Sequence, residues 1–334
     1  MKILFDHPSP FLLAHGGLQR QIEQTKVALG AIGVEVEWLR WWDAEQRGDI
    51  IHYFGRPAAA YIEFAHTKKM KVVLAELLSG LGSRRLAGRV AQKALMKLGA
   101  VLLPCAFAEK LAWRSYRLAD ACVALTPWEG RLMTQMFGAL RERVHVIANG
   151  AEDVFLADVS EKRGPWLVCT ATITERKRVL ELGEAAVRAG TPLWIIGQSY
   201  GDDGYARRFA ELMRKHPTLL RYEGGVSDRA RLAQIYREAR GFVLLSTMES
   251  LSLSALEAAA CGCPLLLTDL PWARSVFGTD ATYCPIANTA ATAAELRRFY
   301  DAAPGLPVPR KPASWREIAV EFKRLYESLM DRRS

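Results

Sequence analysis

Short apolar runs alternate with longer amphipathic segments along the chain. The first run, Lys2 to Phe5, leads into a loop that contains Gly16 and Gly17, and helical periodicity then extends from Leu18 to Ile32. A second apolar run at Val34 to Leu39 completes a strand-helix-strand unit. The same pattern predicts further strands at Asp49–Phe54, Lys71–Glu76 and Asp120–Thr126 and in the run that begins at Arg143.

The second half of the chain restarts this pattern. Four more runs bounded by turns or helical segments predict strands, at Trp166–Ala171, Leu193–Gly197, Leu220–Val226 and Gly241–Leu245. The chain has 334 residues, 50% hydrophobic and 24% charged. This is too long for one core and suits two domains of about 150 residues each. The pattern predicts an α/β protein with open parallel sheets, whose ligands bind where the strands end.

A polar segment after the run at Gly241–Leu245 carries the clearest chemistry. It reads Ser-Thr-Met-Glu-Ser-Leu-Ser-Leu-Ser-Ala-Leu-Glu from Ser246 to Glu257, and Gly262 and Pro264 end the helix that it opens. The first amides of such a helix have no partner within it and lie at the positive end of its dipole. The loop of Ser250, Leu251 and Ser252 is therefore expected to receive a diphosphate.

Two carboxylates flank this loop. Glu249 precedes it, and Glu257 lies about two helical turns further on, so the two can reach different hydroxyl groups of one elongated ligand. The spacing alone has little value, because Glu37 and Glu45 form a second such pair in an ordinary stretch. The alternative is two solvent-exposed glutamates beside an ordinary helix.

The combined pattern Ser-Thr-x-Glu-x7-Glu-Ala-x3-Gly-x-Pro resembles the donor-site signature of the family-4 retaining glycosyltransferases. The resemblance implies the GT-B fold, in which two Rossmann-like domains with parallel sheets face each other across a cleft. It further implies that Glu249 touches the donor sugar and that Glu257 holds the ribose hydroxyls. We expect an acceptor-side domain at residues 1–160, joined by a returning last helix at 312–334, and a nucleotide-sugar-binding domain at 161–311.

Basic residues follow the first strand of the second domain. The segment Thr172-Ile-Thr-Glu-Arg-Lys-Arg178 differs from the family's Gly-Arg-Leu-x3-Lys-Gly, so only the lysine role carries over, to Lys177. Cations placed here would neutralise a departing diphosphate as its negative charge grows. Arg176 is a candidate substitute for the missing family arginine, because Thr172 occupies that position. The alternative is an exposed basic turn that caps a helix.

The acceptor side has weaker signals. Gly16 and Gly17 resemble the family's glycine pair, where the backbone approaches the ligands, although a loop that needs positive φ explains them equally well. Many relatives carry a histidine after the fourth strand, but this chain has Glu76 there. Glu76 and His15 are therefore the acceptor-side candidates.

These residues resemble those of a retaining transfer from a nucleotide-sugar donor to a saccharide or lipid-linked acceptor, without metal or cofactor. No Asp-x-Asp, Gly-x4-Gly-Lys-Ser/Thr or Gly-x-Gly-x2-Gly motif occurs, and the six cysteines lack Cys-x2-Cys spacing, which argues against a metal site, a nucleoside triphosphatase and a dinucleotide enzyme. A GT-B epimerase or phosphorylase stays open. So does a nucleic-acid-binding protein, which the net charge of +9 suggests although no such module is recognisable.

Charge is concentrated in one segment, from Arg84 to Arg117. Eight basic residues stand there against Glu109 alone, interleaved with apolar residues and Trp113. Such a segment can rest on anionic lipid headgroups, and several members of the resembled family act on lipid-linked acceptors; a solvated helical face is the alternative. The first residues, Met-Lys-Ile-Leu-Phe-Asp, show no signal-peptide core. We therefore expect a cytoplasmic protein, peripheral on the inner face of the membrane.

Overall fold

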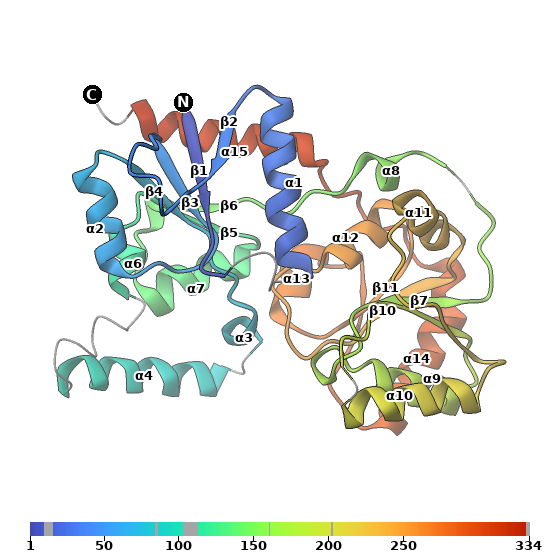
Figure 1. Ribbon diagram of the computed structural model, residues 1–334. Helices are drawn as coiled ribbons and strands as arrows, with labels where there is room; N and C mark the ends of the chain where they lie inside the picture. The colour runs from blue at the N-terminus through green and yellow to red at the C-terminus, as the bar shows by residue number, and fades with distance from the viewer. Residues whose placement is uncertain (10–15, 84–85, 103–112, 160, 202, 332–334) are drawn as a thin grey trace. The chain divides into compact units, whose positions relative to one another are not determined.

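The computed structural model divides the chain into two compact units. Unit 1 comprises Met1–Gly150 and Trp315–Ser334, and unit 2 comprises Ala151–Ser314. The structure describes residues 1–9, 16–83, 86–102, 113–159, 161–201 and 203–331. Figure 1 shows the strands of each unit between flanking helices.

Unit 1 is built on a parallel sheet that is six-stranded in the described residues, with the order β2-β1-β3-β4-β5-β6. Its strands are β1 (Lys2–Asp6), β2 (Glu35–Trp38), β3 (Ile50–Tyr53), β4 (Lys71–Leu74), β5 (Ala121–Ala124) and β6 (Val144–Val146). The inner strands β3 and β5 are buried along their whole length. Such strands read as continuous apolar runs because helices cover both faces of a parallel sheet.

The helices of unit 1 are α1 (Gly17–Ala31), α2 (Ala59–Thr67), α3 (Ser79–Gly82), α4 (Leu86–Leu102), α6 (Trp113–Leu118), α7 (Pro127–Phe137) and α15 (Trp315–Asp331), with a 3-10 turn, η2 (Arg141–Arg143). Local sequence sets the bounds of α7: the Thr126 side chain accepts from the Glu129 amide, Pro127 takes the first turn, and Gly138 ends the helix at φ 69°. The last helix, α15, packs against α1.

Unit 2 repeats the architecture, with the strand order β12-β11-β10-β7-β8-β9. Its strands, all parallel, are β7 (Leu167–Thr170), β8 (Leu193–Ile196), β9 (Leu220–Tyr222), β10 (Gly241–Leu244), β11 (Leu265–Thr268) and β12 (Thr282–Cys284). Its helices are α8 (Asp153–Leu156), α9 (Val179–Ala189), α10 (Gly204–Lys215), α11 (Arg229–Glu238), α12 (Leu253–Ala260), α13 (Pro271–Phe277) and α14 (Thr289–Ala302), with 3-10 turns η3 (Glu175–Lys177) and η4 (Ala303–Gly305).

The boundary between the units differs from the predicted one. The sequence placed it after residue 160, but the structure places residues 151–159 in unit 2. The Ala151 amide donates to the Ala313 carbonyl at 2.9 Å, and α8 packs on α11 and α12. These contacts fix the segment to unit 2 and also hold residues 312–314 there, so the returning part of unit 1 begins at Trp315 rather than at residue 312.

Each strand predicted from an apolar run is present, with ends within a few residues of the prediction. The strands β11 and β12 are additional. In the described parts of the chain, no helix is both long and apolar enough to cross a membrane. The basic segment 84–117 forms α4 and α6, and its residues 84–85 and 103–112 lie outside the described residues.

Candidate donor-binding site

The candidate site of unit 2 lies where the direction of the sheet's connections reverses. The strands β7 and β10 are neighbours, and from β7 the chain proceeds outward through β8 and β9 before it returns to β10 and continues to β11 on the other side. Loops that leave the carboxyl ends of two such strands diverge and leave room for a ligand. The predicted donor residues lie in these two loops, which follow β7 and β10.

The two loops are joined by hydrogen bonds. The Thr247 amide and hydroxyl both donate to the Arg176 carbonyl, at 2.9 and 3.2 Å. The Arg176 guanidinium in turn donates from Nη1 to the Met248 carbonyl at 2.8 Å. These bonds fix the backbone on which the candidate side chains stand.

Glu249 is the meeting point of the two predicted cations. Its Oε1 accepts from the ammonium of Lys177 and, at 3.2 Å, from Nη1 of Arg176. The side chains of Lys177 and Glu249 are only 13% and 11% exposed. Two cations beside one carboxylate leave a net positive charge at the end of the sheet, which favours a diphosphate. The next residue, Arg178, takes a left-handed conformation at φ 53° and donates instead to the Ala287 carbonyl.

The serine loop opens α12 as predicted. Ser252 is the N-cap, and its hydroxyl accepts from the Ala255 amide at 3.3 Å. Leu251 is buried and anchors the loop. Ser250 is 6% exposed, and within the described part of the chain its hydroxyl has no hydrogen-bond partner. A buried hydroxyl of this kind can bond to a bound ligand.

Glu257 is held in an ion-pair cluster that the sequence analysis missed. Its carboxylate contacts the Arg229 guanidinium, which also bonds to Glu152 Oε1 at 3.0 Å. Burial opposes the charge of Arg229, but Glu257 and Glu152 outweigh burial and raise its pKa. Glu257 is itself only 8% exposed, and a carboxylate buried to this extent needs a cation partner of this kind. The one sequence signal that could have indicated Arg229 as a site residue is its position: it is the first residue of a helix, directly after the N-cap Asp228.

The acceptor-side candidates lie in unit 1. Gly16 precedes α1 with φ 120°, and a Cβ there would meet no atom within 4 Å, so backbone conformation and not crowding requires the glycine. Gly17 is the first residue of α1 rather than part of the loop. Glu76 follows β4 and accepts from the Tyr116 hydroxyl at 2.6 Å. His15 lies outside the described residues.

The structure thus brings Lys177, Arg176 and Glu249 into direct contact and places Ser250–Ser252 beside them in the chain. Glu257 lies further along α12 with its own partners. No group of three His, Cys, Asp or Glu side chains among the described residues is arranged to hold a metal ion.

Comparison with known proteins gives a family match for part of the chain. Residues 164–302, which include both loops, match the family model described as glycosyl transferases group 1. Mannosylfructose-phosphate synthase of Agrobacterium fabrum is 27% identical over 176 residues, which are 46% of this chain and 38% of that enzyme. The matched part of this chain thus spans well under half of the relative's length.

Solved structures share the fold over nearly the whole chain. Sucrose-phosphate synthase from Thermosynechococcus elongatus superposes with a TM-score of 0.70 at 15% identity and covers 99% of this chain and 100% of its own. Anabaena Alr3699/HepE, solved in complex with UDP and glucose, gives 0.63 at 13% identity over 98% of this chain and 100% of its own. The predicted fold class is confirmed: the chain has the two Rossmann-like units of a GT-B fold, and residues 164–302 of it match the glycosyl transferases group 1 model.

Proposed function

We propose that this chain transfers a sugar, with retention of its anomeric configuration and without a metal ion, from a nucleotide-sugar donor to a glycan or lipid-linked acceptor. The observation that carries the proposal is the contact of Lys177 and Arg176 with Glu249 where β7 and β10 end. The matching family model covers these residues, and structures of Anabaena Alr3699/HepE hold UDP, glucose and UDP-glucose. A UDP-sugar is therefore the first donor to test.

Each side chain has a separate task in this proposal. Lys177 and Arg176 stabilise the negative charge that develops on the departing diphosphate. Glu249, placed between them, accepts hydrogen bonds from hydroxyl groups of the donor sugar. Glu257 accepts from the ribose hydroxyls, while its contact with Arg229 fixes the direction of its carboxylate. The chemistry needs no cofactor, because the nucleotide itself is the leaving group.

The test is donor turnover followed by proton NMR. The protein is incubated with UDP-glucose, UDP-galactose, UDP-N-acetylglucosamine and GDP-mannose, each with and without a mixture of acceptor saccharides. We expect release of nucleoside diphosphate that an acceptor accelerates, and a product with the donor's anomeric configuration. An inverted product would contradict the retaining mechanism.

Two other activities would appear in the same experiment. A GT-B epimerase would convert the donor sugar without transfer, and a phosphorylase would consume or form inorganic phosphate. Binding to oligonucleotides with no donor consumption would instead favour the nucleic-acid-binding alternative. Any of these results would overturn the proposal.

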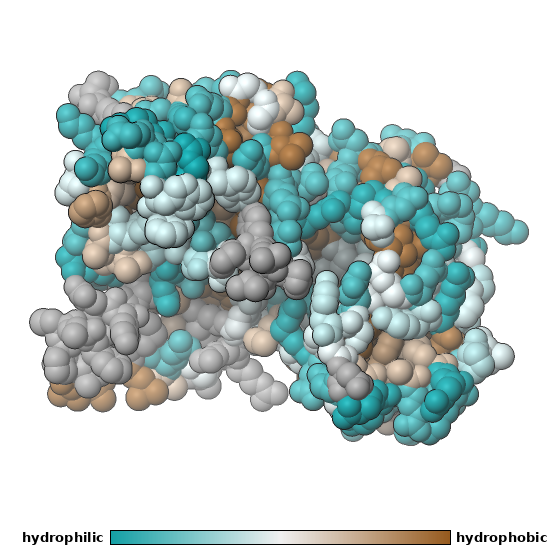
Figure 2. All heavy atoms as spheres, in the orientation of Figure 1, coloured by the Kyte–Doolittle hydropathy of each residue, from teal (hydrophilic) through white to brown (hydrophobic). Residues whose placement is uncertain are grey.

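The lipid-linked form of the acceptor is supported by the exposed face of α4. Leu95, Leu98 and Leu102 are 69%, 56% and 68% exposed, and their spacing places them on one side of the helix. Figure 2 shows hydrophobic residues gathered where α4 lies, at the lower edge of unit 1. Arg89, Lys93 and Lys97 belong to the same helix. Exposed leucines and basic residues on one helix suit a position in the headgroup region of an anionic membrane, on its cytoplasmic face.

Vesicle sedimentation tests this attachment. Each basic residue near an anionic surface is worth about 1 kcal/mol, so replacing Arg89, Lys93 and Lys97 by serine should reduce binding to phosphatidylglycerol vesicles roughly a hundredfold. Val27→Ser on α1, where Val27 is 67% exposed, is the matched control and should bind as wild type does. If native protein does not bind these vesicles at low salt, the membrane attachment is wrong, and a soluble acceptor becomes the proposal.

A further inference from the structure

A second candidate binding region lies within unit 1, along the connection between β2 and β3. A pocket of about 1020 Å³ opens between α2 and the loop that follows β2. Its floor includes Leu4 and Ile51 on the face of the sheet. Residues 39–49 connect β2 to β3 without a helix, so this part of the sheet lacks the helical cover that a parallel sheet usually has. The volume matches the upper end of ligand sites, about 1,000 Å³.

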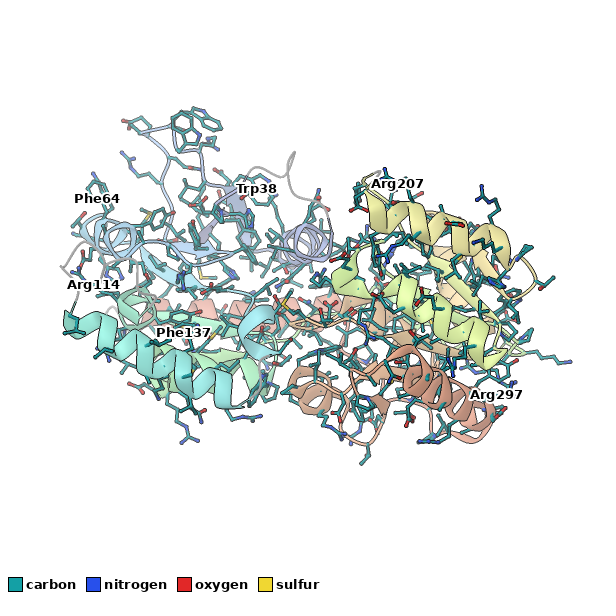
Figure 3. All side chains as sticks on the ribbon, turned by 90° about the horizontal axis from the view of Figure 1, so that it is seen from below. Trp38, Phe64, Arg114, Phe137, Arg207 and Arg297 are labelled. Atoms are coloured by element: carbon teal, nitrogen blue, oxygen red, sulfur yellow. The ribbon has the colours of Figure 1, made fainter. Side chains whose placement is uncertain are left out.

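Aromatic side chains stand at the mouth of this pocket. Trp41 and Phe64 line it and are 85% and 68% exposed. Trp42, 68% exposed, packs edge-on against Trp41 with ring centroids 5.7 Å apart. Figure 3 labels Phe64 on α2 and Trp38 at the end of β2, and the loop after Trp38 stands out from the sheet. Large aromatic rings left in water at one pocket indicate a ligand surface.

The loop is held in place before any ligand arrives. The Arg40 amide donates to Gln46 Oε1 at 2.8 Å, and the Gln46 side-chain amide donates to the Trp38 carbonyl at 2.9 Å and to Glu37 at 3.0 Å. Asp43 accepts from two nitrogens of the Arg40 guanidinium, at 3.0 and 2.8 Å. A loop fixed by its own side chains loses little conformational entropy when it binds.

Both arginines that line the pocket are paired with carboxylates, and Lys68 is one further cation of the lining. Arg40 is paired with Glu37 and Asp43, and Arg47 with Glu45. An acyl phosphate or another anion would have to compete with these carboxylates. A neutral ligand with hydroxyl groups and an apolar face would find both flat aromatic rings and fixed polar side chains.

We propose that this pocket binds a neutral saccharide, with a sugar ring stacked on Trp41 and Phe64 and its hydroxyl groups bonded to the polar rim. The apolar C–H face of a pyranose packs on an aromatic ring, and its equatorial hydroxyls reach side chains such as Gln46 and Asp43 at the edge. This site is separate from the donor-binding residues of unit 2, and its existence does not depend on the proposed transfer.

Saturation-transfer NMR with maltose, cellobiose, lactose and α-1,6-mannobiose tests the proposal. We expect transfer to the ring C–H protons of at least one disaccharide, with affinity at least ten times weaker in Trp41→Ala and in Phe64→Ala. Trp41→Phe, which keeps a flat ring, should recover part of the binding. Val27→Ala is the control for the loss of an exposed apolar side chain and should bind as wild type does.

Glu249→Gln separates this site from the donor-binding site of unit 2. If the proposal is right, disaccharide binding is unchanged in Glu249→Gln even where transfer is lost. Disaccharide binding that Glu249→Gln removes and Trp41→Ala spares would overturn it. Absence of binding to all four disaccharides would also overturn it. The same holds if the pocket binds decanoate, or a second copy of the chain, instead of a disaccharide.

Discussion

The two units are both open parallel sheets, but they differ in strand order and in the residues that stand where the order reverses and a ligand has room. In unit 2 the reversal falls between β7 and β10, and the loops there bring Lys177 and Arg176 against Glu249. In unit 1 the reversal falls between β1 and β3. Gly16 is the last described residue of the loop that follows β1. Each unit thus has a place where a ligand has room. Among the described residues, however, the charges that would hold a diphosphate stand at that place only in unit 2.

Buried ionisable groups separate the units in a second way. Glu257 in unit 2 is buried with the cation Arg229, whereas His52 in unit 1 is fully buried against aromatic rings and contacts the Tyr326 hydroxyl at 2.7 Å. A paired charge next to a ligand loop can serve binding. His52 is neutral, and its contact with Tyr326 joins β3 to α15, so its role is in the packing of the core. The burial of an ionisable group therefore indicates function only together with its partners and its place in the sheet.

The largest expected effect distinguishes two adjacent cations. Lys177→Ala should lower turnover about a hundredfold, because removing one preorganised donor to a developing charge costs about that much. Arg178→Ala should have far less effect, since Arg178 bonds to the Ala287 carbonyl away from Glu249. Equal losses in the two variants, measured at saturating donor, would contradict the assignment of the leaving-group role to Lys177.

A smaller effect tests the separation of tasks along α12 and its loop. Glu249→Gln should reduce turnover roughly tenfold to a hundredfold, or about 1.4–2.7 kcal/mol, and should spare the affinity for nucleoside diphosphate, because its proposed partner is the sugar. Steady-state kinetics and calorimetry on the same preparation provide the comparison. An equal loss of diphosphate affinity would show that Glu249 acts on the nucleotide as well.

In unit 1 we expect a pH effect on stability rather than on chemistry. Burial lowers the pKa of His52 to about 3, against 6.5 for the exposed side chain. As the pH falls below about 6.5 the unfolded chain takes up a proton that the folded unit does not. Unit 1 should therefore lose about 2 kcal/mol of its free energy of unfolding between pH 7 and pH 5. Urea unfolding should show this slope in wild type and a reduced slope in His52→Phe; an unchanged slope would assign it to other groups.

The smallest expected effect concerns Glu76. Glu76 accepts from the Tyr116 hydroxyl and is half-buried, and we propose that it orients an acceptor hydroxyl. Glu76→Gln should raise the acceptor KM by up to about tenfold, equivalent to about 1.4 kcal/mol, while the donor KM stays constant. A change in the donor KM alone would remove Glu76 from the acceptor side.

Sequence reasoning was strongest where one contiguous segment carried both structure and chemistry. The run at Gly241–Leu245 and the serine loop after it predicted β10 and the helix α12 that the loop opens. It failed where contacts join distant segments. The pairing of Arg229 with Glu152 and Glu257, and the bond that holds Ala151 to Ala313, depend on residues far apart in the chain, and no local pattern reports them.

The pocket beside Trp41 is a second feature that local sequence patterns could not predict. Its walls come from β1, α2 and the loop after β2, and the exposure of its aromatic residues follows from a missing crossover helix. The apolar pattern locates the strands on both sides of that connection but does not report what covers the sheet between them.

The central claim, that unit 2 holds a nucleotide through the cluster around α12, is tested most directly by calorimetric titration with UDP, GDP and ADP. We predict that at least one of them binds wild-type protein and that Glu257→Gln weakens this binding by about 1–3 kcal/mol, the range for a hydrogen bond to a charged group. Glu249→Gln should bind the same nucleotide as wild type does. Unchanged affinity in Glu257→Gln, or no binding of any of the three nucleotides, would contradict the account.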